Sequence, residues 1–323
     1  MNTLWTEALN KADVSVTDSP SATDTWISPI EGFAALSVVG PDAQKFLQGQ
    51  LSCDVAALNS AMAGLGSHCN PQGRMVSNFR IFSPEPQHYV LVMRDSLRDI
   101  AQKQLQKYIV FSKATLSQVE GLVAVGLHGP SASQIVAELF EISTQQQNSC
   151  VQSEHGVAIQ VDQNKQSYEL YLSTTHAADI LVSLLGTLKA CDHQHWEATL
   201  IKHGLLYIHG DQSGEHIPLV INFDQLGGIN FKKGCYTGQE IIARLHYRGK
   251  AKRSLYALTA AAEFSVARGQ KVLLSDDQKA IGEIVSTATT KNLTTLLAIL
   301  NLSADEALPA LQLENSGPSL FVL

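Results

Sequence analysis

The sequence has few charged residues and no long apolar segment. Asp, Glu, Lys and Arg make up 16% of the 323 residues, against about 25% in typical globular domains. No apolar run reaches the roughly 18 residues of a membrane-spanning helix, and no tract has the low-complexity composition that resists folding. These absences argue against a charge-rich disordered chain and against a helical membrane protein.

Cysteine is also scarce. The five cysteines are odd in number, form no C-x-x-C pair and lie at positions 53, 69, 150, 191 and 235. Scattered thiols of this kind are typical of a reducing compartment, not of a disulfide framework. The first residues lack the basic and apolar regions of a secretory signal peptide. The sequence therefore predicts a cytoplasmic location.

The chain is acidic overall, with a net charge of −7, which argues against coating nucleic acid along its whole surface. The stretch from Phe231 to Ser254 departs from this average, because it holds seven Lys and Arg residues and one acid, Glu240. Such a stretch can bind phosphate, a polyglutamyl tail or RNA. A solvated basic helix face is the alternative.

An internal repeat with an offset of 89 residues indicates two related α/β subdomains. Residues 32–43 and 121–132 share Gly, Ala, Gly, Pro and Ala at five equivalent positions. Each copy reads as an apolar strand, a Gly-Pro turn and a helix with Asp42 or Ser131 as its N-cap. The alternative is a coincidence between two ordinary strand–helix connections.

Beyond Arg253 the pattern changes to short apolar or alternating runs separated by turn residues. The runs lie at 255–258, 271–274, 280–285, 296–300 and 320–323. This spacing predicts a small antiparallel barrel or sandwich. We therefore place a domain boundary at residue 250, with the two-subdomain region over 1–250 and a C-terminal β-barrel over 251–323.

The densest local signal is the segment 227–240, which reads GGINFKKGCYTGQE. Thr237 and Glu240 have the spacing of a capping box, which predicts a helix with Thr237 as its N-cap. Cys235 then lies two residues before a helix N-terminus and follows two lysines, and all of these influences lower the pKa of a thiol. The pattern predicts a reactive thiol at Cys235. A small buried hydrophobe in a turn is the alternative.

This segment resembles the K-G-C-Y-x-G-Q-E signature of the YgfZ family of folate-binding proteins, which are relatives of the glycine cleavage T-protein. The matching residues are Lys233, Gly234, Cys235, Tyr236, Gly238, Gln239 and Glu240. The similarity extends to the segments 40–50, 69–74 and 250–253, so that it covers most of the chain from residue 32 to residue 254.

The resemblance implies an α+β fold of the aminomethyltransferase type, in which three subdomains form a ring around a channel and an antiparallel β-barrel follows. It implies that tetrahydrofolate or a derivative binds in the channel. It also implies support for the synthesis or repair of iron–sulfur enzymes, such as a tRNA methylthiotransferase, and so for tRNA modification. Cys235 occupies the position of the functional thiol, with Lys233 beside it. A tRNA contact through the stretch 232–253 is a further expectation.

Two departures separate the chain from an aminomethyltransferase. A T-protein carries paired aspartates after its first Gly-rich turn, and here Ser77 and Asn78 stand at those positions. Neither side chain acts as a general base near neutral pH. We therefore expect an assisting or non-catalytic folate-binding protein. A folate-dependent one-carbon transferase and an RNA-interaction module are the alternatives.

Family members flank the folate with two tryptophans. Trp196 matches one of them, whereas Phe33 takes the place of the other and supplies an aromatic face without an indole N–H. Lys202 stands where relatives usually carry a glutamate suited to the pteridine N–H groups, and a cation cannot accept those hydrogen bonds. The resemblance thus implies a folate site at Phe33 and Trp196, with an affinity that Lys202 alters.

We expect no metal site. Cys191, His193 and His195 alternate and would share one face of a strand. No fourth ligand lies nearby in the sequence.

Overall fold

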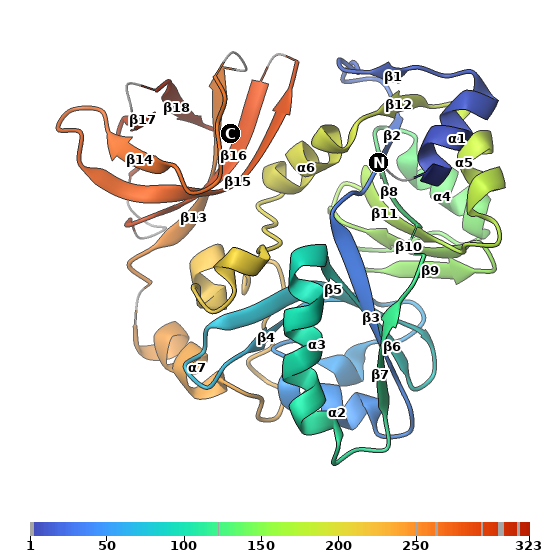
Figure 1. Ribbon diagram of the computed structural model, residues 1–323, viewed down its shortest axis with the longest axis horizontal. Helices are drawn as coiled ribbons and strands as arrows, with labels where there is room; N and C mark the ends of the chain where they lie inside the picture. The colour runs from blue at the N-terminus through green and yellow to red at the C-terminus, as the bar shows by residue number, and fades with distance from the viewer. Residues whose placement is uncertain are drawn as a thin grey trace.

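The computed structural model describes residues 3–121, 123–249, 251–261, 264–291, 293–302, 307–314 and 317–323. These residues form a five-stranded sheet, a seven-stranded sheet and a closed barrel, which Figure 1 shows around a central region crossed by the chain after α6. None of the helices in these ranges is long and apolar enough to cross a membrane.

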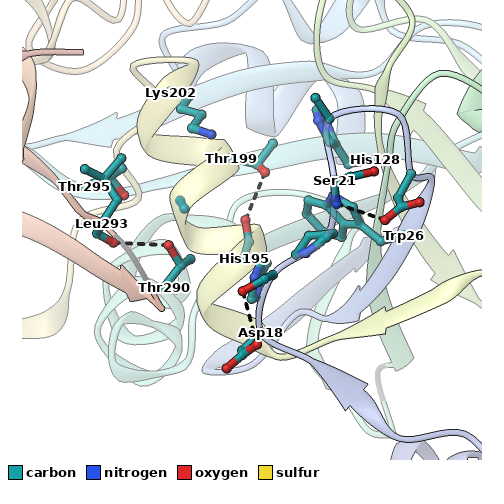
Figure 2. A pocket seen from close by; sticks show the side chains of 15 residues that line it. Asp18, Ser21, Trp26, His128, His195, Thr199, Lys202, Thr290, Leu293 and Thr295 are labelled. Carbon is teal, nitrogen blue, oxygen red and sulfur yellow. Dashed lines mark hydrogen bonds between the residues drawn. The ribbon is translucent and has the colours of Figure 1, made fainter.

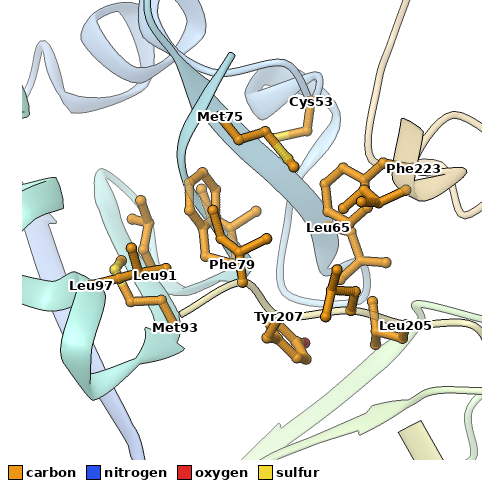
Figure 3. Close-up of a cluster of buried hydrophobic side chains, with 14 of the residues drawn as sticks. Cys53, Leu65, Met75, Phe79, Leu91, Met93, Leu97, Leu205, Tyr207 and Phe223 are labelled. Carbon is orange, nitrogen blue, oxygen red and sulfur yellow. The ribbon is translucent and has the colours of Figure 1, made fainter. Parts of the chain in front are cut away.

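The five-stranded sheet has the order β4-β5-β6-β3-β7, and all its neighbouring strands are antiparallel. Its strands are β3 (Phe33–Val39), β4 (Gly64–Cys69), β5 (Met75–Glu85), β6 (His88–Arg94) and β7 (Thr115–Val119). The helices α2 (Ala43–Gln50) and α3 (Asp95–Ile109) belong to this unit, together with the short helix η1 (Val55–Ala57). Figure 3 shows part of its core, which includes Phe79 and Met93 and also Tyr207 from a distant segment.

The seven-stranded sheet has the order β1-β12-β2-β8-β11-β10-β9. Its strands are β1 (Val16–Thr17), β2 (Trp26–Pro29), β8 (Val123–His128), β9 (Cys150–Ser153), β10 (Gly156–Gln160), β11 (Ser167–Leu172) and β12 (Lys189–Cys191). The helices α1 (Thr3–Ala12), α4 (Ala132–Phe140) and α5 (Ala177–Leu185) accompany it. The two sheets share an apolar cluster in which Phe82 stacks on Tyr171 at 5.3 Å.

Both copies of the repeat follow the same path of strand, glycine turn and helix. Gly40 and Gly129 have φ values of 139° and 132°, and a Cβ there would lie 2.4 Å from Lys113 O and 2.5 Å from Asp24 O, respectively. Asp42 and Ser131 are the N-cap residues, as predicted, but neither caps its helix through a side-chain hydrogen bond. Asp42 instead accepts a hydrogen bond from Lys113 N. A passing backbone segment therefore fixes each turn.

The predicted antiparallel barrel is confirmed. It consists of β13 (Ser254–Ala261), β14 (Lys271–Leu274), β15 (Ala280–Thr290), β16 (Leu293–Leu300), β17 (Leu311–Leu313) and β18 (Ser319–Val322). The strands close in the order β13-β16-β15-β14-β17-β18. Residue 250, at the predicted domain boundary, lies outside the described residues, so the division into two regions stays a prediction.

The linking segment between the second sheet and the barrel passes through the centre of the molecule (Figure 1). It contains α6 (His193–Lys202), the short helices η2 (Gly210–Gln212) and η3 (Pro218–Ile221), and α7 (Gln239–Arg248). Helix α6 packs against β15 of the barrel and β2 of the seven-stranded sheet. Residues 205–208 follow α6 as a fully buried extended strip.

Candidate functional site

Lys233 holds the signature loop against the five-stranded unit. Its ammonium group donates hydrogen bonds to the backbone carbonyls of Gln48 at 2.7 Å, Leu51 at 2.7 Å and Cys53 at 2.9 Å. An ammonium group has three N–H donors, so these carbonyls use all of them. Burial lowers the pKa of Lys233. The structure therefore gives Lys233 an anchoring position, with its charge directed into the fold.

The predicted capping box is wrong. Helix α7 begins at Gln239, its N-cap is Gly238 with φ 83°, and no side chain caps it. A Cβ on residue 238 would lie 2.5 Å from Asn70 O, so close packing and the left-handed backbone conformation both require glycine there. Cys235 consequently lies four residues before the first helical residue, further from the helix dipole than the sequence predicts.

Cys235 is exposed, whereas the other four cysteines are buried, and all five are free thiols. Burial raises the pKa of Cys53, Cys69 and Cys191 to about 12 and also raises the pKa of Cys150. These four thiols therefore remain protonated and out of reach at neutral pH. Cys235 is the thiol that a partner can contact.

The remaining signature residues surround this thiol in different environments. Gly234 is exposed, and a Cβ there would meet no atom within 4 Å. Tyr236 is buried, and its hydroxyl group has no hydrogen-bond partner among the described residues. Gln239 and Glu240 occupy the first turn of α7, where Glu240 is exposed. The loop thus turns Cys235 outward and Tyr236 inward.

Trp196 presents no free aromatic face. Its side chain on α6 is only 1% exposed. A Cβ on Gly126 of β8 would lie 2.1 Å from the indole ring, so the ring lies directly on this strand. The indole N–H is buried without a partner among the described residues. Trp196 therefore packs α6 onto the seven-stranded sheet.

Phe33 lies half-buried at the start of β3, and two side chains contact its ring. The Arg94 guanidinium group lies 4.3 Å from the ring centroid, and Tyr207 approaches edge-on at 5.1 Å. Arg94 also donates two hydrogen bonds to the Glu197 carboxylate, at 2.8 and 2.5 Å. Arg94 on β6 thus lies between the Phe33 ring on β3 and the Glu197 carboxylate on α6, and this stack links the three elements.

A cavity of about 400 Å³ adjoins this stack. Its walls are Glu31, Gly32, Arg94, His193, Gln194, Glu197, His209, Arg268, Ser286 and Thr287. Burial lowers the pKa of His209 to about 4, and the nearby arginines act in the same direction, so its imidazole is neutral at pH 7. Two polar atoms of the lining residues, Arg94 Nε and Thr287 Oγ1, are buried without partners among the described residues.

A buried ion pair connects the two sheets. Arg80 on β5 lies 2.8 Å from the Glu169 carboxylate on β11, and both side chains are almost fully buried. Tyr171 and Tyr207 donate hydrogen bonds to the same carboxylate at 2.9 and 3.3 Å. The Arg80 guanidinium group also reaches the Asn148 side chain at 2.7 Å. This network fixes Tyr207 against Phe33.

Ser77 and Asn78, which replace the aspartates of an aminomethyltransferase, are both buried. The Asn78 amide donates to Leu206 O at 2.6 Å and accepts from Ile208 N at 2.9 Å. A carboxylate can only accept, so an aspartate at this position would face the Leu206 carbonyl without a proton to share. Asn78 therefore holds the central strip in place.

Lys202 lines a second cavity, of about 280 Å³, shown in Figure 2. Trp26, His128 and His195 line it as well, whereas Glu197 lines the 400 Å³ cavity described above. The two cavities are thus reached from different faces of α6. The position of Lys202 gives no support to the expected effect on a site at Phe33.

No three His, Cys, Asp or Glu side chains in the described ranges form a metal-binding cluster. The alternation of Cys191, His193 and His195 is broken, because β12 ends at Cys191 and α6 begins at His193. His195 Nδ1 instead lies 2.7 Å from the carboxylate of Asp192, the N-cap of α6.

The structure also brings together three aromatic rings that sequence reasoning missed. Phe231 stacks on His246 at 3.9 Å, and Tyr247 approaches both rings edge-on. Fifteen positions separate Phe231 from His246 in the sequence, so no local periodicity connects them. The basic composition of this stretch was the only available signal.

The fold and parts of the sequence match known proteins. The family model for the GCVT N-terminal domain matches residues 24–196. The tRNA-modifying protein YgfZ of Klebsiella pneumoniae (strain 342) is 33% identical over 259 residues, which cover 80% of this chain and 79% of the relative. The tRNA-modifying protein YgfZ of Yersinia pseudotuberculosis serotype O:1b is 32% identical over 284 residues, 86% of each chain.

Among solved structures, aminomethyltransferase T of the glycine cleavage system from Bartonella henselae superposes with a TM-score of 0.73. The match covers 98% of this chain and 88% of that protein at 14% sequence identity. This likeness confirms the predicted α+β fold of the aminomethyltransferase type with its C-terminal barrel.

Proposed function

Since the chain belongs to the YgfZ family, we propose that it is a folate-binding accessory protein for the synthesis or repair of iron–sulfur enzymes. Through a client such as a tRNA methylthiotransferase it would support tRNA modification. The observation that carries this proposal is the signature loop, which presents Cys235 to solvent while Lys233 ties the loop to the fold.

Cys235 is the functional thiol of the proposal. An iron–sulfur cluster requires about four protein ligands, and the other four cysteines are buried. Any cluster contacted by Cys235 is therefore held chiefly by the client enzyme. Lys233 acts as a positioning residue, because its ammonium group is bonded to the fold and not to the thiol.

The 400 Å³ cavity beside Phe33 is the proposed site for tetrahydrofolate or a derivative. Its unpartnered donors, Arg94 Nε and Thr287 Oγ1, suit a ligand with acceptor atoms. Glu197 can accept from pteridine N–H groups, and Arg268 suits the carboxylates of the folate tail. Phe33 would supply the stacking face once Arg94 moves off its ring. When bound, the folate would supply one-carbon chemistry, and the chain's own residues would hold the folate in place and shield it from water.

Trp196 takes an indirect part in this proposal. Its ring is covered by β8, so it supports the position of α6 and thereby of Glu197. An aminomethyltransferase activity is disfavoured, because Asn78 uses both halves of its amide to hold the central strip.

The test of the folate site is a calorimetric titration of the reduced protein with tetrahydrofolate. We expect saturable binding that Phe33→Ala weakens at least tenfold, because the stacking face is lost. Tyr108→Ala, at an exposed aromatic side chain of α3, is the control and should bind like the wild type. Equal affinities of the wild type and Phe33→Ala would refute the placement of folate beside Phe33.

The role of the thiol is tested in cells that carry Cys235→Ala as the only copy. We expect tRNA methylthiolation to be lost, while the purified variant keeps the wild-type folate affinity and circular dichroism spectrum. Thr237→Ala changes a neighbouring side chain of the same loop and should leave methylthiolation intact. Normal methylthiolation with Cys235→Ala would refute the thiol's role.

A further inference from the structure

The aromatic cluster near the signature loop is open to solvent. Tyr247 is 67% exposed. Phe231 and His246 stack nearly parallel, with 18° between their planes. Tyr247 stands edge-on to both rings, at 5.8 and 4.8 Å. The cluster therefore offers the Tyr247 face and a ready-made two-ring stack to a ligand.

A cavity of about 550 Å³ opens beside these rings. Phe231, His246 and Tyr247 line it, together with the amide side chains of Asn148 and Asn230. The cavity is large enough for a nucleotide-sized ligand. Both amides are engaged within the fold, because Asn148 accepts a hydrogen bond from Arg80 and Asn230 donates to Asp54 while it accepts from two backbone N–H groups of its own loop. The lining therefore suits recognition of a base by stacking on the aromatic rings and not by hydrogen bonds to these amides.

The charges around the rings are positive. Lys232, Arg244 and Arg248 are exposed, and no carboxylate in the described ranges forms an ion pair with any of them. Arg244 and Arg248 are four residues apart on α7 and so share a helix face. Glu240 is the exposed acid on the same helix, and two further nearby acids are already engaged. Asp224 faces His246 at 3.9 Å, and Asp54 accepts hydrogen bonds from Gln48 and Asn230.

We infer that this aromatic–basic surface binds an unpaired nucleobase and the flanking phosphates of single-stranded RNA. The surface consists of Phe231, Lys232, Arg244, His246, Tyr247 and Arg248. Stacked aromatic rings beside unpaired cations are the pattern of sequence-tolerant single-strand binding. A base inside a duplex cannot reach such rings, whereas a base in a loop can unstack onto them.

The inference rests on the proposed function for one point only, the identity of the RNA. If the protein assists tRNA modification, the bound nucleotide belongs to a tRNA loop. The surface lies on the same segment as Cys235, so an RNA bound there would lie alongside the client enzyme that acts on it.

The test is fluorescence anisotropy with a labelled single-stranded RNA of mixed sequence at two salt concentrations. We expect Tyr247→Ala to weaken binding roughly five- to hundredfold at both concentrations, the effect of losing one stacked base. Arg248→Gln should instead flatten the dependence of log affinity on log salt by about 0.7, the contribution of one phosphate contact on a single strand. The matched control Tyr108→Ala should bind within twofold of the wild type.

Three results would overturn the inference. The first is that the wild type shows no salt-dependent RNA binding at low salt, and the second is that the wild type and Tyr247→Ala bind the RNA with equal affinity. The third is that Tyr247→Ala weakens binding to a duplex of the same length as much as it weakens binding to the single strand. Loss of client-enzyme binding by Tyr247→Ala without a change in RNA affinity would assign the surface to a protein partner instead. Because Tyr247→Ala should keep the wild-type tetrahydrofolate affinity, failure here is distinguishable from failure of the proposed function.

Discussion

Replacing Lys233 with methionine should release the signature loop from the fold. The substitution removes an ammonium group that donates to three backbone carbonyls, at 2.7, 2.7 and 2.9 Å. A buried carbonyl left without a donor costs about 1–3 kcal/mol. Lys233 is only half-buried, so water can reach part of the vacated site and the lower value applies to each carbonyl. We therefore expect the loop to lose about 3 kcal/mol of local stability.

Hydrogen exchange measures this loss directly, because loops open locally without global unfolding. The amide of Asn230 donates to Ser52 O at 2.9 Å, so its exchange reports on opening of the loop. A loss of about 3 kcal/mol corresponds to roughly hundredfold faster exchange of this amide. Lys232→Met is the matched control, since the Lys232 side chain is exposed, and it should change exchange by less than threefold.

Unchanged exchange of the Asn230 amide in Lys233→Met would refute the anchoring argument. Equal acceleration in Lys233→Met and Lys232→Met would also refute it, because the effect would then follow from charge alone. Circular dichroism spectra of both variants should match the wild type, which separates opening of the loop from unfolding of the protein.

Three further predictions concern stability. Gly238→Ala should lower the free energy of unfolding by about 2 kcal/mol or more, because the φ of Gly238 is 83° and the new Cβ would lie 2.5 Å from Asn70 O. Gly234→Ala should change the free energy of unfolding by less than about 0.5 kcal/mol, and equal effects of the two substitutions in a denaturant titration would contradict this. Burial lowers the pKa of His68 from 6.5 to about 4, so the unfolded chain binds this proton at a higher pH than the folded protein does. The free energy of unfolding therefore falls as the pH drops from 6.5 towards 4, by up to about 1.4 kcal/mol per pH unit. His68→Phe should flatten this dependence, and identical slopes for the wild type and the variant would contradict the argument. Glu169→Gln leaves the buried Arg80 charge without its carboxylate and should cost about 3–5 kcal/mol, measured by thermal denaturation; a shift of less than about 1 kcal/mol would contradict the burial argument.

The sequence by itself determined the family and the architecture. The signature from Lys233 to Glu240 pointed to the YgfZ family, and the change of pattern beyond Arg253 predicted the antiparallel barrel. The family is readable because the signature is a contiguous run of residues that resembles a known pattern, and the barrel is readable from short-range periodicity. A two-residue alternation bounded by turn residues specifies strands wherever they end up in space.

Tertiary structure decided what the individual residues do. The partners of the Lys233 ammonium group lie about 180 residues away in the sequence, so no local pattern could reveal that this lysine anchors a loop. Gly238 and not Thr237 is the N-cap, and the passing backbone at Asn70 leaves room only for glycine at this position. The burial of Trp196 on Gly126 likewise depends on a contact between distant segments. Local sequence fixes backbone preferences, whereas the partners of a buried or charged side chain come from whichever segment the fold brings beside it.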